Sequence, residues 1–458
     1  MRPRARRHLA FVLTLSFLAV ACGGAPAGPS ASATSSTDGP VPTDGAGSSG
    51  PAPSPSALTG RRSDLAYLVE RLEAIHPNPY LDEGEAAFTA RLETIGAEAD
   101  DMTDAEFLVA VMDLMGHRER DGHSGAWAMA QTGERLHAWP VWLWDFPDGL
   151  RVVAATEPDR DLIGARLVRV GDRPVDEAEA AVEPLVPRDN ASSLRANLPM
   201  YLTLPEVLVA LGLRTPDGPG LTFGLLDGTT RELTTEPLPM PAFHDWIVGV
   251  YGTDYPTGLP PANDGPPHLR RRAEAFWSEE LTDPAVLYVA YNRVLRVAND
   301  GSSVDELARE IRAAAPLEPE QPFVIDLRNN PGGDNNTFVN LRSAVELMAR
   351  ERSGRVSIIA GRSTFSAAGN FITDLLTGAD AEAIRLVGEA PGGGLNIYGD
   401  VDVVTLPDSG IVVLISRRYH ERAPGDDRLA IEPDIPVELT WADYAAGRDP
   451  VLEAALRP

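Results

Sequence analysis

The chain has 458 residues, 43% of them hydrophobic and 23% charged, which is typical of a soluble protein with a sizeable core. Its length favours two or three domains. The formal net charge of −27 argues against nucleic acid and against an anionic lipid surface as partners. The chain contains no lysine, which excludes a lysine base, a Schiff base on lysine and a phosphate-binding loop ending in Gly-Lys.

The N-terminus is typical of an export signal. Arginines within residues 1–8 precede an apolar run from Leu9 to Ala21, which is too short to span a bilayer as a mature helix. The run ends at Cys22, the only cysteine, and Leu18 to Cys22 resembles a bacterial lipobox, in which the cysteine is lipidated. We expect export, with lipidation at Cys22 attaching the protein to the extracytoplasmic face of a bacterial membrane. An ordinary cleaved signal with an incidental cysteine is the alternative.

The next segment, from Gly23 to about Gly60, consists mainly of Gly, Ala, Pro, Ser and Thr and predicts a flexible tether. Apolar residues at helical spacing then predict helices beginning near Ser63, over 85–95 and over 104–115. We expect a small helical N-terminal subdomain.

A change of pattern near Trp139 indicates a different module. Residues 150–155 predict a strand, and residues 162–175 predict a strand, a glycine turn and a second strand that lead into a helix over 176–182. This order is typical of a PDZ-like module. Residues 251–268 are rich in Pro, Gly and Asp and predict a surface loop or lid.

The C-terminal part alternates between strand and helix patterns, which predicts an α/β domain with a largely parallel sheet. The predicted strands are 286–291, 322–327, 356–360, 384–387 and 411–416, and the predicted helices are 304–314, 337–350 and 367–377.

Three clusters at predicted strand ends or loops could carry chemistry, since functional side chains in α/β sheets collect at the carboxyl ends of strands. The first runs from Asp326 to Asn335, and the amides of its Gly332 and Gly333 would suit an oxyanion hole. The alternative is a turn with a structural role only.

The second cluster contains Ser366, which lies between a predicted strand and the helix that begins at Ala367. A serine at this junction is placed beside free helix amides that can hold a developing oxyanion. Ser363, Thr364 or Ser366 could equally cap the helix, which is the usual role of such residues.

The third cluster, Asp121 to Ser124, contains His123. A serine hydroxyl needs a base, and without lysine a histidine is the leading candidate. His123 follows a predicted helix on a loop able to reach another domain. A structural hydrogen-bonding role is the alternative.

The order of these clusters and of four other motifs resembles the C-terminal processing peptidase and tricorn-core family of serine peptidases. The motifs are His76 to Tyr80, Asp121 to Ser124, Asp326 to Gly333, Thr364 to Gly369, Val387 to Glu389, Leu406 to Gly410 and Pro433 to Ile435.

This resemblance implies an α/β protein with a crotonase-like (ClpP/crotonase) core, a helical N-terminal subdomain and a PDZ-like module. The expected segments are a signal peptide at 1–21, a lipid-anchored linker at 22–60, the helical subdomain at 61–138, the PDZ-like module at 139–240 and the catalytic domain at 241–458.

The resemblance also implies roles for individual residues. Ser366 matches the nucleophile, and Gly332, Gly333 and Ala367 match the oxyanion amides. The better-known branch uses a lysine in the loop that here runs from Ala390 to Asn396, so this chain is similar to the tricorn-like branch, whose histidine matches His123. That branch has a second serine before the histidine, whereas here Gly122 precedes His123 and Ser124 follows it.

The orienting acid lies shortly before the Pro-Asp motif in that branch, and the spacing indicates Asp427, with Asp426, Glu432 and Glu389 as alternatives. The loop residues Gly393, Gly394 and Asn396 would help to present an extended peptide.

The sequence therefore predicts a serine peptidase that acts on extracytoplasmic peptides or proteins through a Ser/His acyl-enzyme mechanism. A degenerate relative that binds a ligand or peptide without cleaving it is the alternative. We expect no cofactor and no metal, because no cluster of histidine or carboxylate ligands is apparent. The oligomeric state is not readable from the chain.

Overall fold

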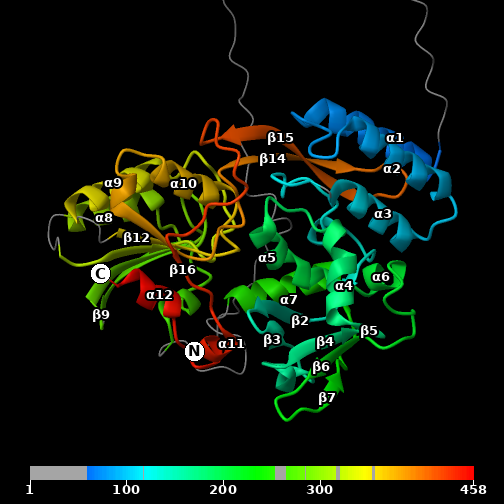
Figure 1. Cartoon of the computed structure of the whole chain (residues 1–458), viewed down its shortest axis with the longest axis horizontal. Coiled ribbons are helices and arrows are strands. Elements are labelled where there is room, and N and C mark those ends of the chain that lie inside the picture. Colours follow the sequence, from blue (N-terminus) through cyan, green and yellow to red (C-terminus); the bar gives the residue numbers. More distant parts are fainter. Residues whose placement is uncertain are drawn as a thin grey trace, which may run out of the picture.

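A computed structural model describes residues 59–116, 118–252, 265–283, 285–315, 320–352 and 356–457. The predicted signal peptide, Cys22 and nearly all of the tether lie outside the described residues. Within the described part, no helix has the length and apolar character needed to cross a membrane. The protein is a mixed α/β structure with several sheets, as predicted (Figure 1).

The N-terminal helices predicted from the sequence are all present. They are α1 (Arg61–Ile75), α2 (Glu85–Glu98) and α3 (Asp104–Gly116). Leu65, Leu68 and Leu72 recur every three or four residues, so they lie on one face of α1, and all three are buried.

A sheet follows these helices, with its strands in the order β2-β3-β4-β6-β7 and antiparallel pairing. The strands are β2 (Val141–Phe146), β3 (Gly149–Ala155), β4 (Arg166–Val170), β6 (Leu221–Gly224) and β7 (Thr230–Glu232), with β5 (Arg173–Pro174) beside β4. The associated helices are α4 (Val175–Val182), α5 (Ala191–Tyr201), α6 (Pro205–Ala210) and α7 (Met240–Gly252). A short pair joins β1 (His137–Ala138) to β8 (Leu238–Pro239).

These two regions share a hydrophobic core. One cluster of buried side chains includes Leu68 of α1, Leu114 of α3, Val152 of β3 and Leu208 of α6. The boundary predicted between residues 138 and 139 therefore crosses a continuous core, and the division into two modules stays a prediction.

The C-terminal sheet has six strands in the order β16-β13-β12-β11-β10-β9. All pairs are parallel except β9 with β10. Its strands are β9 (Phe276–Thr282), β10 (Ala285–Tyr291), β11 (Phe323–Asp326), β12 (Val356–Ala360), β13 (Ile384–Gly388) and β16 (Ile435–Pro436). The helices α8 (Val304–Ala314), α9 (Val339–Glu351) and α10 (Ala367–Leu376) contribute to the core on one face, and α12 (Pro450–Ala455) contributes to the core on the other.

A long hairpin joins the two halves of the molecule. It consists of β14 (Asn396–Thr405) and β15 (Val412–Glu421), which pair antiparallel. Figure 1 shows it leaving the C-terminal lobe and reaching the N-terminal helices. Val404, Val413 and Ile415 of the hairpin belong to the N-terminal hydrophobic core. The hairpin thereby brings distant segments of the chain together at one site.

The predicted loop over 251–268 differs from the structure at its end. Residues 253–264 lie outside the described residues. Pro267–Leu269 is a short 3₁₀ turn whose residues are all buried, so this end is not a surface loop. His268 explains the burial in part, because its Nδ1 pairs with Asp449 of the C-terminal segment at 2.9 Å.

Candidate active site

Ser366 lies on a tight turn between β12 and α10. Every residue of β12 is buried, and the turn is closed by Thr364, whose hydroxyl donates to the carbonyl of Leu327 at 2.8 Å and accepts from the amide of Gly361 at 3.0 Å. Ser366 has φ of +55° and ψ of −126°, a backbone conformation that a residue with a side chain rarely adopts. Such strained strand-to-helix turns expose nucleophilic serines in other hydrolases.

The Ser366 hydroxyl lies 2.9 Å from Nε2 of His123, although 243 positions separate the two residues. Ser366 occupies the N-cap position of α10, but its side chain makes no capping hydrogen bond in the described structure. The capping alternative for Ser366 is therefore wrong. The His123 ring also stacks on Phe365, with ring centroids 4.6 Å apart.

The loop that carries His123 is held by the segment before α5. The amide of Gly122 donates to Oδ1 of Asp189 at 2.6 Å, and the amide of Arg120 donates to the Asp189 carbonyl at 3.0 Å. Burial raises the pKa of Asp189 to about 8, and the negative charge of Asp121 acts in the same direction. Asp189 is therefore mainly a neutral carboxylic acid at pH 7.

Asp121 forms a buried network on the other side of His123. Its carboxylate accepts from Nε2 of His76 at 3.0 Å, from the Ser124 amide at 3.1 Å and from the Ser416 hydroxyl at 2.6 Å. Burial alone would raise the pKa of Asp121, but these hydrogen bonds outweigh it and hold the pKa below its usual value. The Ser124 hydroxyl accepts from the Ser416 amide at 2.9 Å, so Ser124 ties the loop to β15.

His123 is buried, and its burial affects the pKa of the imidazole. Burial lowers the pKa of His123 to about 4, while the charges of Asp121 and Asp400 oppose the shift. The imidazole is neutral at physiological pH and can accept a proton. Its Nδ1 has no hydrogen-bond partner among the described residues. The carbonyl of Tyr398 on β14 is near enough to raise the pKa of His123.

The structure does not bring the expected acid to His123. Asp427 is exposed, and its backbone carbonyl accepts from Arg120 at 2.5 Å. The alternatives are committed or exposed as well: Asp426 pairs with Arg428, Glu389 pairs with Arg362, and Glu432 is exposed. The choice of Asp427 fails because the segment before Pro433 does not place a carboxylate against Nδ1.

His420 and Asp400, which the sequence did not indicate, lie close enough to His123 to affect its pKa. A Cβ added to Gly399 would be 3.7 Å from Cε1 of His123 and 3.5 Å from Nε2 of His420. His420 in turn lies 3.4 Å from Oδ1 of Asp400, which has an unusual φ of +56°. Their position near His123 depends on how β14 pairs with β15, so no local sequence pattern could have indicated them.

The glycine turn after β11 adjoins the nucleophile. The Gly332 amide donates to the side chain of Asn330 at 2.9 Å, so this amide is occupied and the oxyanion role predicted for it is wrong. A Cβ on Gly332 would lie 2.7 Å from Cβ of Ser366, so only glycine fits there. The amides of Gly333 and Ala367 make no hydrogen bond in the described part of the chain.

The loop after β13 packs against the nucleophile turn. The Gly393 amide donates to the Thr364 carbonyl at 3.2 Å, and a Cβ on Gly394 would lie 2.9 Å from the Leu429 carbonyl. Asn396 is saturated, because its Nδ2 donates to two carbonyls and its Oδ1 accepts from two amides within residues 422–426. The Asn396 side chain orders this loop and cannot also bind a peptide, contrary to the prediction.

The arrangement is equipped for nucleophilic chemistry. A hydroxyl and a neutral imidazole meet at the N-terminus of α10, and the glycine turn after β11 packs against the same serine, an arrangement suited to acyl transfer. Within the described ranges, no group of three or more His, Cys, Asp or Glu side chains is placed to hold a metal ion.

Comparisons with known proteins give matches in structure only. No family model and no curated protein matches the sequence. A mutant of CPAF matches with a TM-score of 0.56 at 14% sequence identity, over 86% of this chain and 96% of that chain. This likeness shows that the two proteins share a fold.

Two further structures overlap with this chain too little to establish a shared fold. A protein of Parabacteroides merdae designated a peptidase has a TM-score of 0.27 at 18% identity, over 40% of this chain and 63% of its own. A protein of Bacteroides fragilis designated an S41 protease has a TM-score of 0.28 at 14% identity, over 70% of this chain and 82% of its own.

Proposed function

We propose that the chain is a serine peptidase that cleaves peptide bonds through an acyl-enzyme on Ser366. The observation that carries the proposal is the 2.9 Å contact between the Ser366 hydroxyl and Nε2 of a buried, neutral His123. The fold shared with CPAF, a serine protease, supports it. His123 takes the hydroxyl proton as Ser366 attacks the carbonyl carbon, and it later returns the proton to the leaving amine.

The oxyanion of the tetrahedral intermediate is held by the amides of Gly333 and Ala367 in this proposal. Neither amide makes a hydrogen bond to another described residue, and Ala367 is the first residue of α10, where the helix dipole favours negative charge. The C-terminal sheet with α8, α9 and α10 is then a crotonase-like core. The sheet from β2 to β7 with α4 is a PDZ-like module.

The experiment that tests the proposal is covalent labelling by a fluorophosphonate probe. We expect wild-type protein to be labelled and both Ser366→Ala and His123→Ala to lose labelling. Ser303→Ala is the matched control, because Ser303 does cap a helix, α8, and is expected to keep full labelling. Cleavage of a peptide library by wild type but not by Ser366→Ala separates a peptidase from other serine hydrolases.

Two outcomes would contradict the proposal. Labelling that persists in Ser366→Ala would place the nucleophile elsewhere. Folded wild-type protein that neither reacts with the probe nor cleaves peptides would favour the binding-protein alternative.

We also propose that the protein is exported and anchored through lipid on Cys22, where it meets extracytoplasmic peptides. The lipobox-like sequence supports this part of the proposal. Metabolic labelling with a radioactive fatty acid should mark the wild-type protein and not Cys22→Ala. Equal labelling of both would contradict it.

A further inference from the structure

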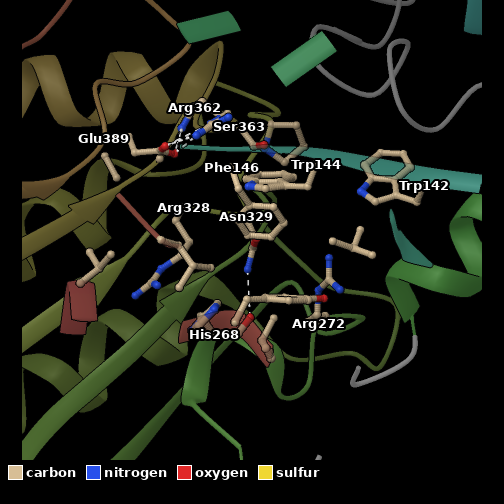
Figure 2. A pocket seen from close by; sticks show the side chains of 18 of the residues that line it. Trp142, Trp144, Phe146, His268, Arg272, Arg328, Asn329, Arg362, Ser363 and Glu389 are labelled. Carbon is tan, nitrogen blue, oxygen red and sulfur yellow. Dashed lines mark hydrogen bonds and ion pairs between the residues drawn. The ribbon is translucent and has the colours of Figure 1, made fainter. Parts of the chain in front are cut away.

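A cavity of about 140 Å³ lies where the carboxyl ends of β11 and β12 face the edge strand β2 (Figure 2). Trp142, Trp144 and Phe146 of β2 supply one wall, and Tyr444 of α11 (Trp441–Ala445) contributes to the lining. We call this space the tryptophan cavity. Its size is close to that of an engineered cavity of about 150 Å³ that holds benzene, so it can take one aromatic ring.

The tryptophan cavity adjoins both turns of the candidate active site. Pro331 lines it, and the next residue, Gly332, packs against Ser366. Ser363 lines it too, three positions before the nucleophile. Figure 2 shows Trp144 and Phe146 beside Ser363 and Asn329. Ligands of open α/β sheets bind at the carboxyl ends of strands, which is the location of this cavity.

The charged groups around the cavity disfavour a cation. Four arginines and one glutamate line it, namely Arg272, Arg293, Arg328, Arg362 and Glu389. Among the described residues that line the cavity, the one carboxylate is committed, because Glu389 pairs with Arg362. A lysine or arginine side chain that entered would be desolvated and would find no free carboxylate among these residues.

We propose that the tryptophan cavity is a specificity subsite that takes a large apolar, preferentially aromatic, side chain of the peptide substrate and rejects a basic one. The proposal rests on the proposed peptidase function. Since Ser366 and His123 do not line the cavity, the side chain belongs to a residue displaced along the bound peptide from the scissile bond.

The first test measures binding without catalysis. N-acetyl-phenylalaninamide is titrated into the Ser366→Ala protein by calorimetry, with N-acetyl-lysinamide as the comparison ligand. We expect the phenylalanine compound to bind and the lysine compound to bind at least about tenfold more weakly. Absence of binding by the phenylalanine compound would overturn the proposal whatever the enzyme does.

Two variants change the cavity in opposite senses. Val153→Trp fills it, because Val153 is a buried lining residue, and Trp144→Ala enlarges it. Val248→Trp is the matched control, since Val248 is an exposed residue of α7 outside the lining. We expect Val153→Trp to weaken binding of N-acetyl-phenylalaninamide at least about tenfold and Val248→Trp to leave it unchanged. Equal binding by Val153→Trp and Val248→Trp would contradict the subsite.

The second test uses hydrolysis. Peptide libraries that vary each position among Phe, Ala and Lys should show a preference for Phe at one position in wild type. Val153→Trp and Trp144→Ala should lower kcat/KM for the Phe peptides at least about tenfold relative to the Ala peptides. Unchanged ratios would sink the subsite. Loss of labelling and hydrolysis in the wild type itself would instead defeat the proposed function.

Discussion

At the scale of single residues, the base is tuned by burial more than by one partner. His123 loses most of its affinity for a proton because its ring is buried, and Asp121 restores part of it. A neutral imidazole can accept the proton of Ser366 at once. The imidazolium formed during the reaction is then stabilised by the charges of Asp121 and Asp400 and by the carbonyl of Tyr398, each of which raises the pKa of His123.

The low pKa of His123, about 4, predicts an unusual pH dependence. The rate of fluorophosphonate labelling should stay constant from pH 8 to about 5.5 and fall roughly tenfold per pH unit below pH 4, because only the neutral ring accepts the proton. Labelling rates across this range, with circular dichroism as the folding control, would check it. A midpoint near 6.5, the usual value for histidine, would contradict the buried environment of the ring.

The carboxylates around His123 predict which acid matters. Asp121→Asn should lower kcat/KM by roughly tenfold or more, because the Asp121 charge favours the imidazolium that forms during the reaction. It should also shift the labelling midpoint to lower pH, because the Asp121 charge raises the pKa of His123. Asp427→Asn, the control, should stay within about twofold of wild type. If Asp427→Asn is the more damaging change, the described position of Asp427 is not the catalytic one.

At the scale of elements, regular apolar patterns predicted the limits of helices and strands, and interrupted patterns did not. The helix over 304–314 and the strand over 356–360 have the predicted limits, since each is a periodic run with clear ends. Strand β14 escaped prediction because Gly399 and Asp400 interrupt its pattern. Helix α5 was not predicted either, because Pro199 inside it disfavours a helix.

The candidate site was predictable to the same degree. Ser366 and His123 followed from the order of motifs along the chain. The other charged groups near His123 did not, because Asp400 and His420 reach it only through the pairing of β14 with β15. The occupied amide of Gly332 also escaped, since it depends on the rotamer of Asn330.

The glycine turn after β11 predicts a sharp effect of one methyl group. Gly332→Ala would place a Cβ 2.7 Å from Ser366 and 2.8 Å from the Phe365 carbonyl, at a φ of +104°. Displacing the nucleophile by such a contact should lower kcat/KM by about 100-fold or more. Gly228→Ala is the control, because Gly228 has a φ of +83° with no atom within 4 Å of the added Cβ. Gly228→Ala should lower the free energy of unfolding and leave kcat/KM unchanged.

The Gly228→Ala control also separates the backbone strain of a positive φ from the steric contact with Ser366. Both glycines have positive φ, so both alanine variants should lose on the order of 1 kcal/mol of unfolding free energy from the backbone alone. Activity should fall only in Gly332→Ala. Equal kinetics in the two variants would show that the turn relaxes away from Ser366 without consequence.

At the scale of the whole molecule, the site exists because three distant segments converge on residues 187–193. Asp189 holds the loop of His123, and Nδ2 of Asn190 donates to the carbonyls of Pro391 and Leu429, each at 3.0 Å. Arg362, four positions before Ser366, donates to the Asp145 carbonyl of β2 at 2.6 Å. Nucleophile, base and the sheet from β2 to β7 are thus parts of one connected structure, and no single segment could have shown this.

Asp189 makes this connection sensitive to pH. Its ordinary pKa is 3.8, and in the folded protein it is about 8. The unfolded chain therefore releases this proton near pH 4, whereas the folded protein keeps it, so its contribution to stability is complete below pH 4 and is lost as pH rises toward 8. Asp189→Asn mimics the protonated acid at every pH and removes this dependence.

The expected result is a difference in Tm between Asp189→Asn and wild type that grows in favour of the variant from pH 4 to pH 8 and then levels off. The free-energy difference at pH 8 should be at most about 5 kcal/mol, since each unit of pKa shift corresponds to about 1.4 kcal/mol. Thermal unfolding at several pH values, with Asp427→Asn as a matched exposed control, provides the measurement. A difference that is constant across this range would mean that Asp189 is ionised in the folded protein and that its link to the Gly122 amide is a charged one.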